Sequence, residues 1–297
     1  MRDSPEAVVS EQGKILRAIM IGDVVGDPGL DALERRLPSL IKENSANFVM
    51  INGENAAGGF GLTAAILEKI FNIGVDVVSS GNHIWEKREF WSVLNTEKRV
   101  LRPMNYPTGC PGNGWIKLEK SPGPVSWIAV NLQGREFMTP IDCPFKNIDD
   151  FVAGQGDSVS ETHLILTSDG LLPEYLQEKS VILVDFHAES SREKEALAYY
   201  LDGRVTVITG THTHVQTADE RILPKGTAYI TDLGMTGALD GIIGMDTKIC
   251  LDRARNQVLY RMEVAAPDME SKTTVQGIIV EINAETCKAV SIKRFSV

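Results

Sequence analysis

The stretch ILRAIMIGDVVGDPGLDALERRLPSLIKEN, residues 15–44, contains the first strand and the first helix expected of the fold. Residues 15–21 form a short apolar run, which is typical of a strand buried on both faces, and the run ends at a Gly-Asp pair. A helix is predicted next, because Asp27 suits an N-cap, Pro28 suits the first helical position, and leucines recur at helical spacing. Pro38 is expected to bend or divide this helix.

Strand and helix patterns alternate along the remainder of the chain, and together they predict an α/β fold. Further strands are expected at 48–51, 75–80, 125–132, 163–169, 181–186 and 205–209, with helices from Thr63 to Gly74 and over 191–201. Four antiparallel strands are expected in the tail, within 227–234, 259–265, 277–282 and 288–295. We therefore predict a single domain over residues 15–297, preceded by a loose extension at 1–14.

Composition excludes several classes of function. The formal net charge of −10 and the pI near 5.1 oppose non-specific binding to a nucleic-acid backbone, which needs a surplus of lysine and arginine. No signal peptide is expected, because residues 1–14 are polar and have no long apolar segment, and no apolar run approaches the roughly 20 residues of a membrane helix. Its four cysteines are widely spaced, without a C-x-x-C pair, which favours reduced thiols and a cytoplasmic location.

Polar side chains follow five of the predicted strands directly. An isolated H-x-H pair such as that in GTHTH, residues 210–214, is by itself more often a solvated loop than a ligand pair. Polar side chains at five strand ends favour a shared site instead, because ligands of open α/β sheets bind beyond the carboxyl ends of the strands. The side chains at these ends are Asp23, Glu54, Asn55, Asn82, His83, His187, His212 and His214.

These side chains supply nitrogen and oxygen ligands and no thiolate. Such a set suits iron, manganese or zinc rather than calcium or copper(I). There are enough ligands for two ions, and a carboxylate shared between them, most simply that of Glu54, would hold them at the spacing that activates a hydroxide. Phosphoester hydrolysis is the natural chemistry of this kind of site, and a small anionic phosphodiester is the expected substrate.

The order of these motifs resembles the calcineurin-type metallophosphoesterases, and their details resemble the bacterial YmdB-like branch. GDVVG, NGENAA, GNH-x-W, DFHAE and the run from GTHTHVQTADERILP to TAYITDLGMTG carry the resemblance, at 22–26, 52–57, 81–85, 185–189 and 210–237. Most members of the wider superfamily have a histidine where Val25 stands, and an aspartate where Glu54 stands. Asn55 is the neighbour that could replace the missing ligand.

The resemblance implies a four-layer α/β/β/α sandwich of two mixed sheets with a dinuclear metal centre. It implies a first ion on Asp23, Glu54, Asn55 and His214, and a second on Glu54, Asn82, His187 and His212. Iron is the first expectation, in divalent or mixed-valence form, with manganese and zinc as alternatives. His83 is implied as the residue that assists the leaving group, with a hydrogen bond to a metal ligand as the alternative role.

The implied activity is that of a metal-dependent phosphodiesterase acting on cyclic nucleotides, both 2′,3′-cyclic and 3′,5′-cyclic. Two alternatives stay open at this point: a phosphomonoesterase or RNA-processing hydrolase with the same metals, and a regulatory protein that binds a nucleotide or a partner with incidental catalysis. A homo-oligomer is compatible with the sequence, although no patch specifies one. Trp85 could stack on a base, although a tryptophan is more often a buried core residue.

Overall fold

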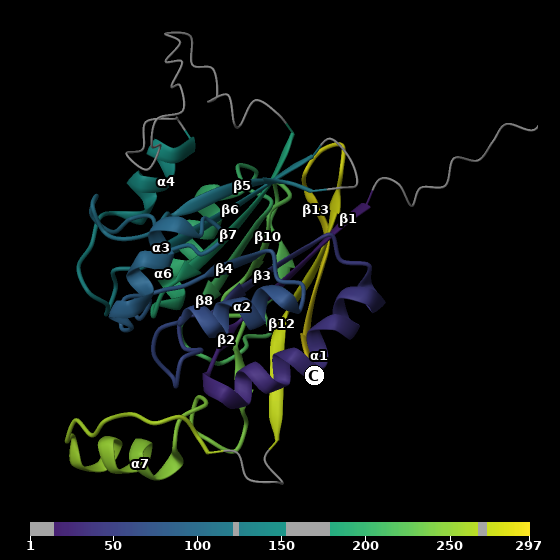
Figure 1. Ribbon diagram of the computed structural model, residues 1–297. Coiled ribbons are helices and arrows are strands. Elements are labelled where there is room, and N and C mark those ends of the chain that lie inside the picture. Colours follow the sequence, from purple (N-terminus) through teal and green to yellow (C-terminus); the bar gives the residue numbers. More distant parts are fainter. Residues whose placement is uncertain (1–14, 121–124, 153–178, 267–271) are drawn as a thin grey trace, which may run out of the picture.

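The computed structural model describes residues 15–120, 125–152, 179–266 and 272–297, and within them the chain forms two mixed sheets (Figure 1). The first sheet has the order β2 (Asp23–Val24), β11 (Met235–Ala238), β12 (Thr273–Asn283), β1 (Ile15–Ile21), β3 (Phe48–Asn52) and β4 (Val77–Ser79), with β13 (Ala289–Ser296) paired to β12. The second has the order β5 (Trp115–Glu119), β6 (Ser126–Gln133), β7 (Ser180–His187), β8 (Val207–Thr211), β10 (Ala228–Ile230) and β9 (Arg221–Ile222).

Three apolar clusters define four layers. One cluster joins the first sheet to the helices α1 (Gly26–Asn44), α2 (Ala64–Asn72) and α3 (Trp91–Thr96), the last preceded by a short 3₁₀ turn at Arg88–Phe90. Another joins the second sheet to α4 (Pro144–Val152) and α6 (Ser191–Leu201). The third lies between the sheets, where Phe48 and Trp127 stack with ring centroids 4.8 Å apart. The expected α/β/β/α sandwich is therefore confirmed.

Parallel pairing determines where the functional loops lie. In the first sheet β1, β3 and β4 run parallel, and in the second β6, β7, β8 and β10 do. Parallel strands present their carboxyl ends at one edge of their sheet. The two edges come together because Asn52, at the end of β3, donates a hydrogen bond of 3.0 Å to Asp185 of β7. Loops from both sheets thus share one end of the sandwich.

The start of α1 differs from expectation. The helix begins at Gly26 with Val25 as its N-cap, so the prediction of Asp27 as N-cap is wrong. Backbone carbonyls replace a capping side chain, because the N–H groups of Val25 and Gly26 bond to Thr236 and Asn55. The helix also continues through Pro38 without division; Pro38 is exposed, and water can satisfy the carbonyl that it leaves unpaired.

The tail is only partly as predicted. Strands β12 and β13 pair antiparallel, as expected. Strand β10 pairs antiparallel with β9 but parallel with β8, so the antiparallel prediction for 227–234 holds on one side of that strand only. Residues 259–265 form no strand among the described residues, and Val264 makes only an isolated bridge to Met245. A helix that the pattern did not predict, α7 (Thr247–Asn256), precedes them. It has no buried residue, so it lacks the apolar stripe that identifies a helix in a sequence.

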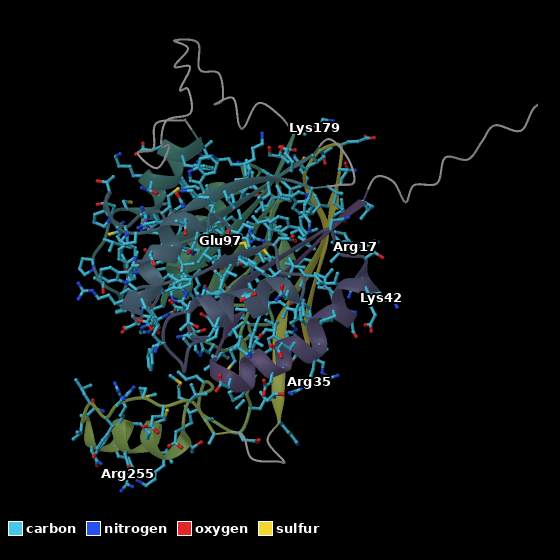
Figure 2. All side chains as sticks on the ribbon, in the orientation of Figure 1. Arg17, Arg35, Lys42, Glu97, Lys179 and Arg255 are labelled. Atoms are coloured by element: carbon cyan, nitrogen blue, oxygen red, sulfur yellow. The ribbon has the colours of Figure 1, made fainter. Side chains whose placement is uncertain are left out.

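Helix α7 projects away from the sandwich, with Arg255 at its outer end (Figure 2). The predicted strand at 163–169 and the predicted extension at 1–14 lie outside the described residues. No helix in the described part of the chain is long and apolar enough to cross a membrane.

Candidate metal centre

The structure brings the predicted site residues together at the shared end of the two sheets. Glu54, His187 and His212 each offer a ligand atom, and these atoms all lie within 4.8 Å of one another. The Nε2 atom of His187 is 3.0 Å from Oε1 of Glu54 and 3.0 Å from Nδ1 of His212. A carboxylate and two imidazoles at this spacing form a group that could hold a metal ion.

Asp23 extends this group toward His214. Its Oδ1 atom is 3.8 Å from Nδ1 of His187 and 3.9 Å from Nε2 of His214, and its Oδ2 accepts the backbone N–H of His212 at 3.2 Å. Asp23 is fully buried. Asp23 therefore contacts both histidines of the H-x-H loop, the backbone of His212 through Oδ2 and the ring of His214 through Oδ1.

Three of the predicted ligands carry a buried oxygen without a hydrogen-bond partner among the described residues: Asp23 Oδ1, Asn55 Oδ1 and Asn82 Oδ1. Leaving such an acceptor unsatisfied costs about 1–3 kcal/mol, so each one needs an explanation. For Asn55 the orientation is fixed, because its Nδ2 donates to the carbonyl of Gly59 at 2.9 Å. These oxygens come from three different segments that each follow a buried strand, and cations bound there would satisfy them. The residues present therefore fit a metal centre.

The charges of the site also fit a cation. Burial alone would lower the pKa of His187, but the adjacent carboxylate of Glu54 raises it to about 9. Burial alone would raise the pKa of Glu54, but His187 brings it down to about 2. A proton on His187 thus supplies the positive charge that the carboxylates require. Burial and the charge of His187 lower the pKa of His212 to about 3, which leaves a neutral imidazole, the form that binds metals.

Side chains behind the site orient His187. Thr211 places its hydroxyl 3.0 Å from Nδ1 of His187 and donates it to Asp185 at 2.7 Å. Asp185 also accepts hydrogen bonds from Asn52 and from Ser79 of the opposite sheet, at 3.0 and 2.5 Å. These bonds fix the ring and join the two sheets directly behind it. Thr211, Asn52 and Ser79 are not among the residues that the strand-end pattern of the sequence singles out.

The H-x-H loop is held in a strained conformation. His212 and His214 have φ angles of 101° and 62°, in the left-handed region that residues other than glycine rarely adopt. Thr213, between them, donates its backbone N–H to Asp232 at 3.2 Å, and the Nδ1 atom of His214 lies 2.9 Å from the carbonyl of Ile243. The loop is therefore fixed from both sides. Glu189 also approaches this loop, with Oε2 at 3.3 Å from Nε2 of His212.

A buried ion pair supports this loop and is not evident from the sequence pattern. Lys194 of α6 donates to Asp232 at 2.7 Å, and each side chain is only 1% exposed. We expect Lys194→Met to lower the free energy of unfolding by about 3 kcal/mol, because the buried carboxylate of Asp232 would lose its countercharge and keep only its backbone hydrogen bonds. We also expect metal affinity to fall by about 10–100-fold, because the loop that carries His212 and His214 loosens.

Urea unfolding and metal titration of the variant test this prediction. Lys248→Met is a matched control: Lys248 pairs with Asp252 on the surface of α7 and is 87% exposed, so its loss should leave the free energy of unfolding almost unchanged. Equal stabilities of the two variants would contradict a supporting role for Lys194.

His83 differs from the predicted ligands in its surroundings. Only its backbone N–H contacts Glu54, at 3.0 Å from Oε2, while its Nδ1 lies 3.4 Å from Glu86 and its ring packs edge-on against Phe60. The side chain is about a quarter exposed, whereas those of Asp23 and His187 are fully buried. It is therefore placed at the solvent side of the cluster, where it can exchange protons.

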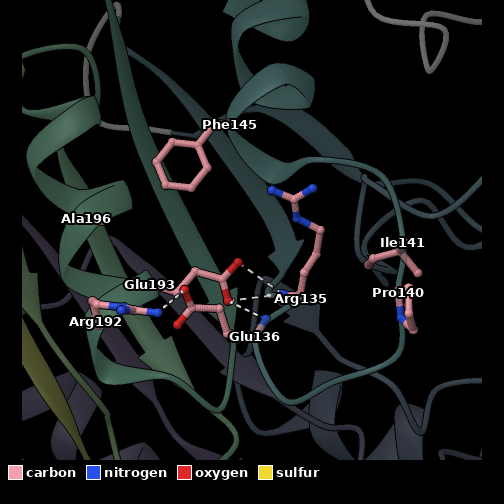
Figure 3. Close-up of a pocket in the computed structure, with 8 residues that line it drawn as sticks. All are labelled: Arg135, Glu136, Pro140, Ile141, Phe145, Arg192, Glu193 and Ala196. Atoms are coloured by element: carbon pink, nitrogen blue, oxygen red, sulfur yellow. Dashed lines mark hydrogen bonds and ion pairs between the residues drawn. The ribbon is translucent and has the colours of Figure 1, made fainter.

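A cavity of about 490 Å³ lies elsewhere, between α4, α6 and the loop after β6 (Figure 3). Glu193 forms part of its wall and accepts the backbone N–H groups of Arg135 and Glu136, while Arg192 pairs with Glu136. The cavity shares no lining residue with the metal centre. It is a feature of the helix-covered face of the second sheet and not part of the site.

Comparisons with known proteins agree with the geometry. The model of the YmdB-like protein family matches residues 19–295. A 2′,3′-cyclic-nucleotide 2′-phosphodiesterase of Bacillus subtilis is 43% identical over 94% of this chain and 96% of its own length. A putative phosphatase/phosphodiesterase of Mycoplasma pneumoniae is 35% identical over 75% of this chain and 73% of its own.

Two solved structures have the same fold over almost the whole chain. One is a hypothetical protein of Thermus thermophilus, with a TM-score of 0.79 and 37% identity, covering 95% of this chain and 99% of that one. The other is described as a novel phosphatase of Mycoplasma pneumoniae, with a TM-score of 0.81 and 29% identity, covering 95% and 93%. The two sheets and their shared end are therefore common to all three chains.

Proposed function

The chain belongs to the YmdB-like family, and from that premise we propose that it is a metal-dependent phosphodiesterase that hydrolyses cyclic nucleotides, 2′,3′-cyclic ones in particular. The observation that carries the proposal is the cluster of Glu54, His187 and His212, together with three buried oxygens that have no hydrogen-bond partner among the described residues, on Asp23, on Asn55 next to Glu54 in the chain, and on Asn82 next to His83. The name of the Bacillus subtilis relative supports the substrate class. The acidic composition of the chain is compatible with a small anionic substrate whose charge is balanced locally by cations.

We assign the ligands to two ions. Asp23, Glu54, Asn55 and His214 would hold the first, and Glu54, Asn82, His187 and His212 the second. Two transition-metal ions would supply positive charge to the phosphoryl oxygens and an activated water as nucleophile, with iron as the first expectation and manganese or zinc as alternatives. The carbonyl of Ile243 and the hydroxyl of Thr211 keep the rings of His214 and His187 in place. The cytoplasm, with its reduced thiols, is the proposed location.

His83 is proposed to give a proton to the leaving oxygen. We expect His83→Asn to lower kcat for 2′,3′-cyclic AMP about 100-fold with unchanged metal content, because only the backbone of His83 contacts Glu54. The loss should be much smaller for bis-p-nitrophenyl phosphate, since p-nitrophenolate departs without protonation whereas a ribose alkoxide does not. Steady-state kinetics on both diesters measure this difference, and equal losses on the two would contradict the role of proton donor.

The proposed function is tested by elemental analysis of the purified protein together with hydrolysis assays before and after chelation. We expect about two transition-metal ions per chain, and chelator-sensitive hydrolysis of 2′,3′-cyclic AMP that returns when metal is restored. Faster turnover of p-nitrophenyl phosphate than of its diester would favour a phosphomonoesterase instead. Metal binding without hydrolysis of either would favour a regulatory binding protein.

A further inference from the structure

A polar group that the proposed chemistry does not use lies next to the metal centre. Gln133 is the last residue of β6, and the parallel register pairs it with His187, the last residue of β7. Register neighbours on adjacent strands point their side chains to the same face of a sheet. The side chain of Gln133 therefore belongs to the face between the sheets, beside a predicted metal ligand.

The amide of Gln133 is only half used. Its Oε1 accepts a hydrogen bond of 3.1 Å from the hydroxyl of Tyr106, whereas its Nε2 is buried and has no partner among the residues that the structure describes. Gln133 itself is fully buried. An amide nitrogen that is removed from water without an acceptor is costly, so this donor needs an acceptor that arrives from outside the protein.

The position of the amide is built rather than incidental. Asn105 clamps the backbone of Gln133 from both sides: its Oδ1 accepts the N–H of Gln133 at 2.9 Å, and its Nδ2 donates to the carbonyl at 2.8 Å. Tyr106 is adjacent to Asn105 in the chain, and its ring packs edge-on against Trp85 at 4.5 Å. Trp85 is in turn held by its indole N–H, which donates to the carbonyl of Pro111.

The surroundings of the Tyr106 phenol place it and its partner Gln133 near the metal centre. Burial raises the pKa of its phenol, the hydrogen bond to Gln133 opposes the rise, and the negative charge of Glu54 adds to it. The phenol is therefore protonated at neutral pH and within electrostatic reach of the metal centre. Tyr106 is only partly buried, so part of its side chain remains accessible. Gln133 and Tyr106 form a wall between His187 on one side and the His83 to Trp85 segment on the other.

We propose that Gln133 and Tyr106 form the subsite that binds the sugar of a nucleotide substrate, with the amide N–H of Gln133 donating to a ribose oxygen. This inference rests on the proposed phosphodiesterase function. The wall offers an amide and a phenol, neither of them charged at neutral pH, and such groups suit hydroxyl and ether oxygens. The charged phosphoryl oxygens are better matched by cations at the neighbouring cluster.

The test compares a diester that contains ribose with one that does not, using the full chain loaded with metal. In Gln133→Met, which keeps length and volume but has no donor, we expect KM for 2′,3′-cyclic AMP to rise about tenfold, the effect of one lost hydrogen bond. The value of kcat/KM for bis-p-nitrophenyl phosphate, which has no sugar, should stay within about twofold. Asn147→Ala, which removes another buried and unpartnered amide oxygen on α4, serves as the matched control. It should change the kinetic constants for neither substrate.

A second measurement tests the sugar subsite with a ligand that has no phosphate. Adenosine should inhibit hydrolysis of bis-p-nitrophenyl phosphate competitively, and its inhibition constant should rise about tenfold in Gln133→Met and in Tyr106→Phe. Tyr106→Phe removes only a hydroxyl, so it remains informative if Gln133→Met folds poorly. Equal losses on both diesters, or unchanged kinetics on both, would overturn the assignment to the sugar. Failure of the wild-type protein to hydrolyse either diester would instead contradict the proposed function, and the inference with it.

Discussion

Replacing Glu54 with glutamine is expected to lower kcat/KM for 2′,3′-cyclic AMP by about 10⁴-fold, or about 5.5 kcal/mol of transition-state stabilisation. The two oxygens of Glu54 reach different parts of the site, Oε1 to His187 and Oε2 to the backbone N–H of His83. Because the proposed assignment has Glu54 bind both ions, its negative charge is the group whose loss affects the whole centre. Glutamine has the same shape, so the loss is one of charge and not of packing.

Elemental analysis shows whether Glu54→Gln loses activity because it loses metal or while it keeps both ions. We expect the metal content of Glu54→Gln to drop from about two ions per chain to one or none. Glu97→Gln is the control, since Glu97 also forms a close ion pair, 2.8 Å from Arg99, but lies outside the strand-end loops. Full metal content with full activity in Glu54→Gln would remove the basis of the dinuclear assignment.

The part of the site that the sequence predicts is the part that follows directly from buried strands. An apolar run that stops at a polar residue identifies both a strand and its carboxyl end, as with Ile21 before Asp23 and Thr211 before His212. Parallel strands then bring such ends to one edge whatever the details of the helices. For this reason the grouping of Asp23, Glu54, His187 and the H-x-H loop can be expected from the sequence alone.

The supporting groups cannot be expected in this way, because each depends on contacts between distant segments. Lys194 is one of several charged residues on α6, and only the structure shows that it is buried against Asp232, 38 residues away.

Gln133 differs from Lys194, because it ends a strand as the metal ligands do and so has a sequence signal of the same kind. That signal is easily missed, because glutamine is not a common metal ligand.

The errors in the fold have a related cause. Residues 259–265 have an alternating pattern that is typical of a strand, but a strand also needs a neighbour with free hydrogen-bonding groups, and this segment makes only one bridge. Asp27 was expected to cap α1, but the carbonyls of Thr236 and Asn55 reach the first N–H groups instead. Local patterns describe what a segment can do, and packing decides which option is used.

Gly81→Ala is expected to lower kcat/KM for the cyclic nucleotide about 10³-fold, or about 4 kcal/mol, although it adds only one methyl group. A Cβ atom at Gly81 would lie 2.1 Å from Cδ2 and 2.3 Å from Nε2 of His187, so the imidazole would have to move. The ring of His187 is fixed from behind by Thr211, so it cannot move away freely. The loop that contains Gly81 also carries Asn82, so the substitution would displace His187 or Asn82 from the second ion. Kinetics and metal analysis measure the effect, with Gly109→Ala as the control: Gly109 has a φ of +91° but open space around it, so alanine there should cost stability without loss of metal. If Gly81→Ala kept both ions and full activity, the position of His187 would not matter to the chemistry, and its assignment as a ligand would be wrong.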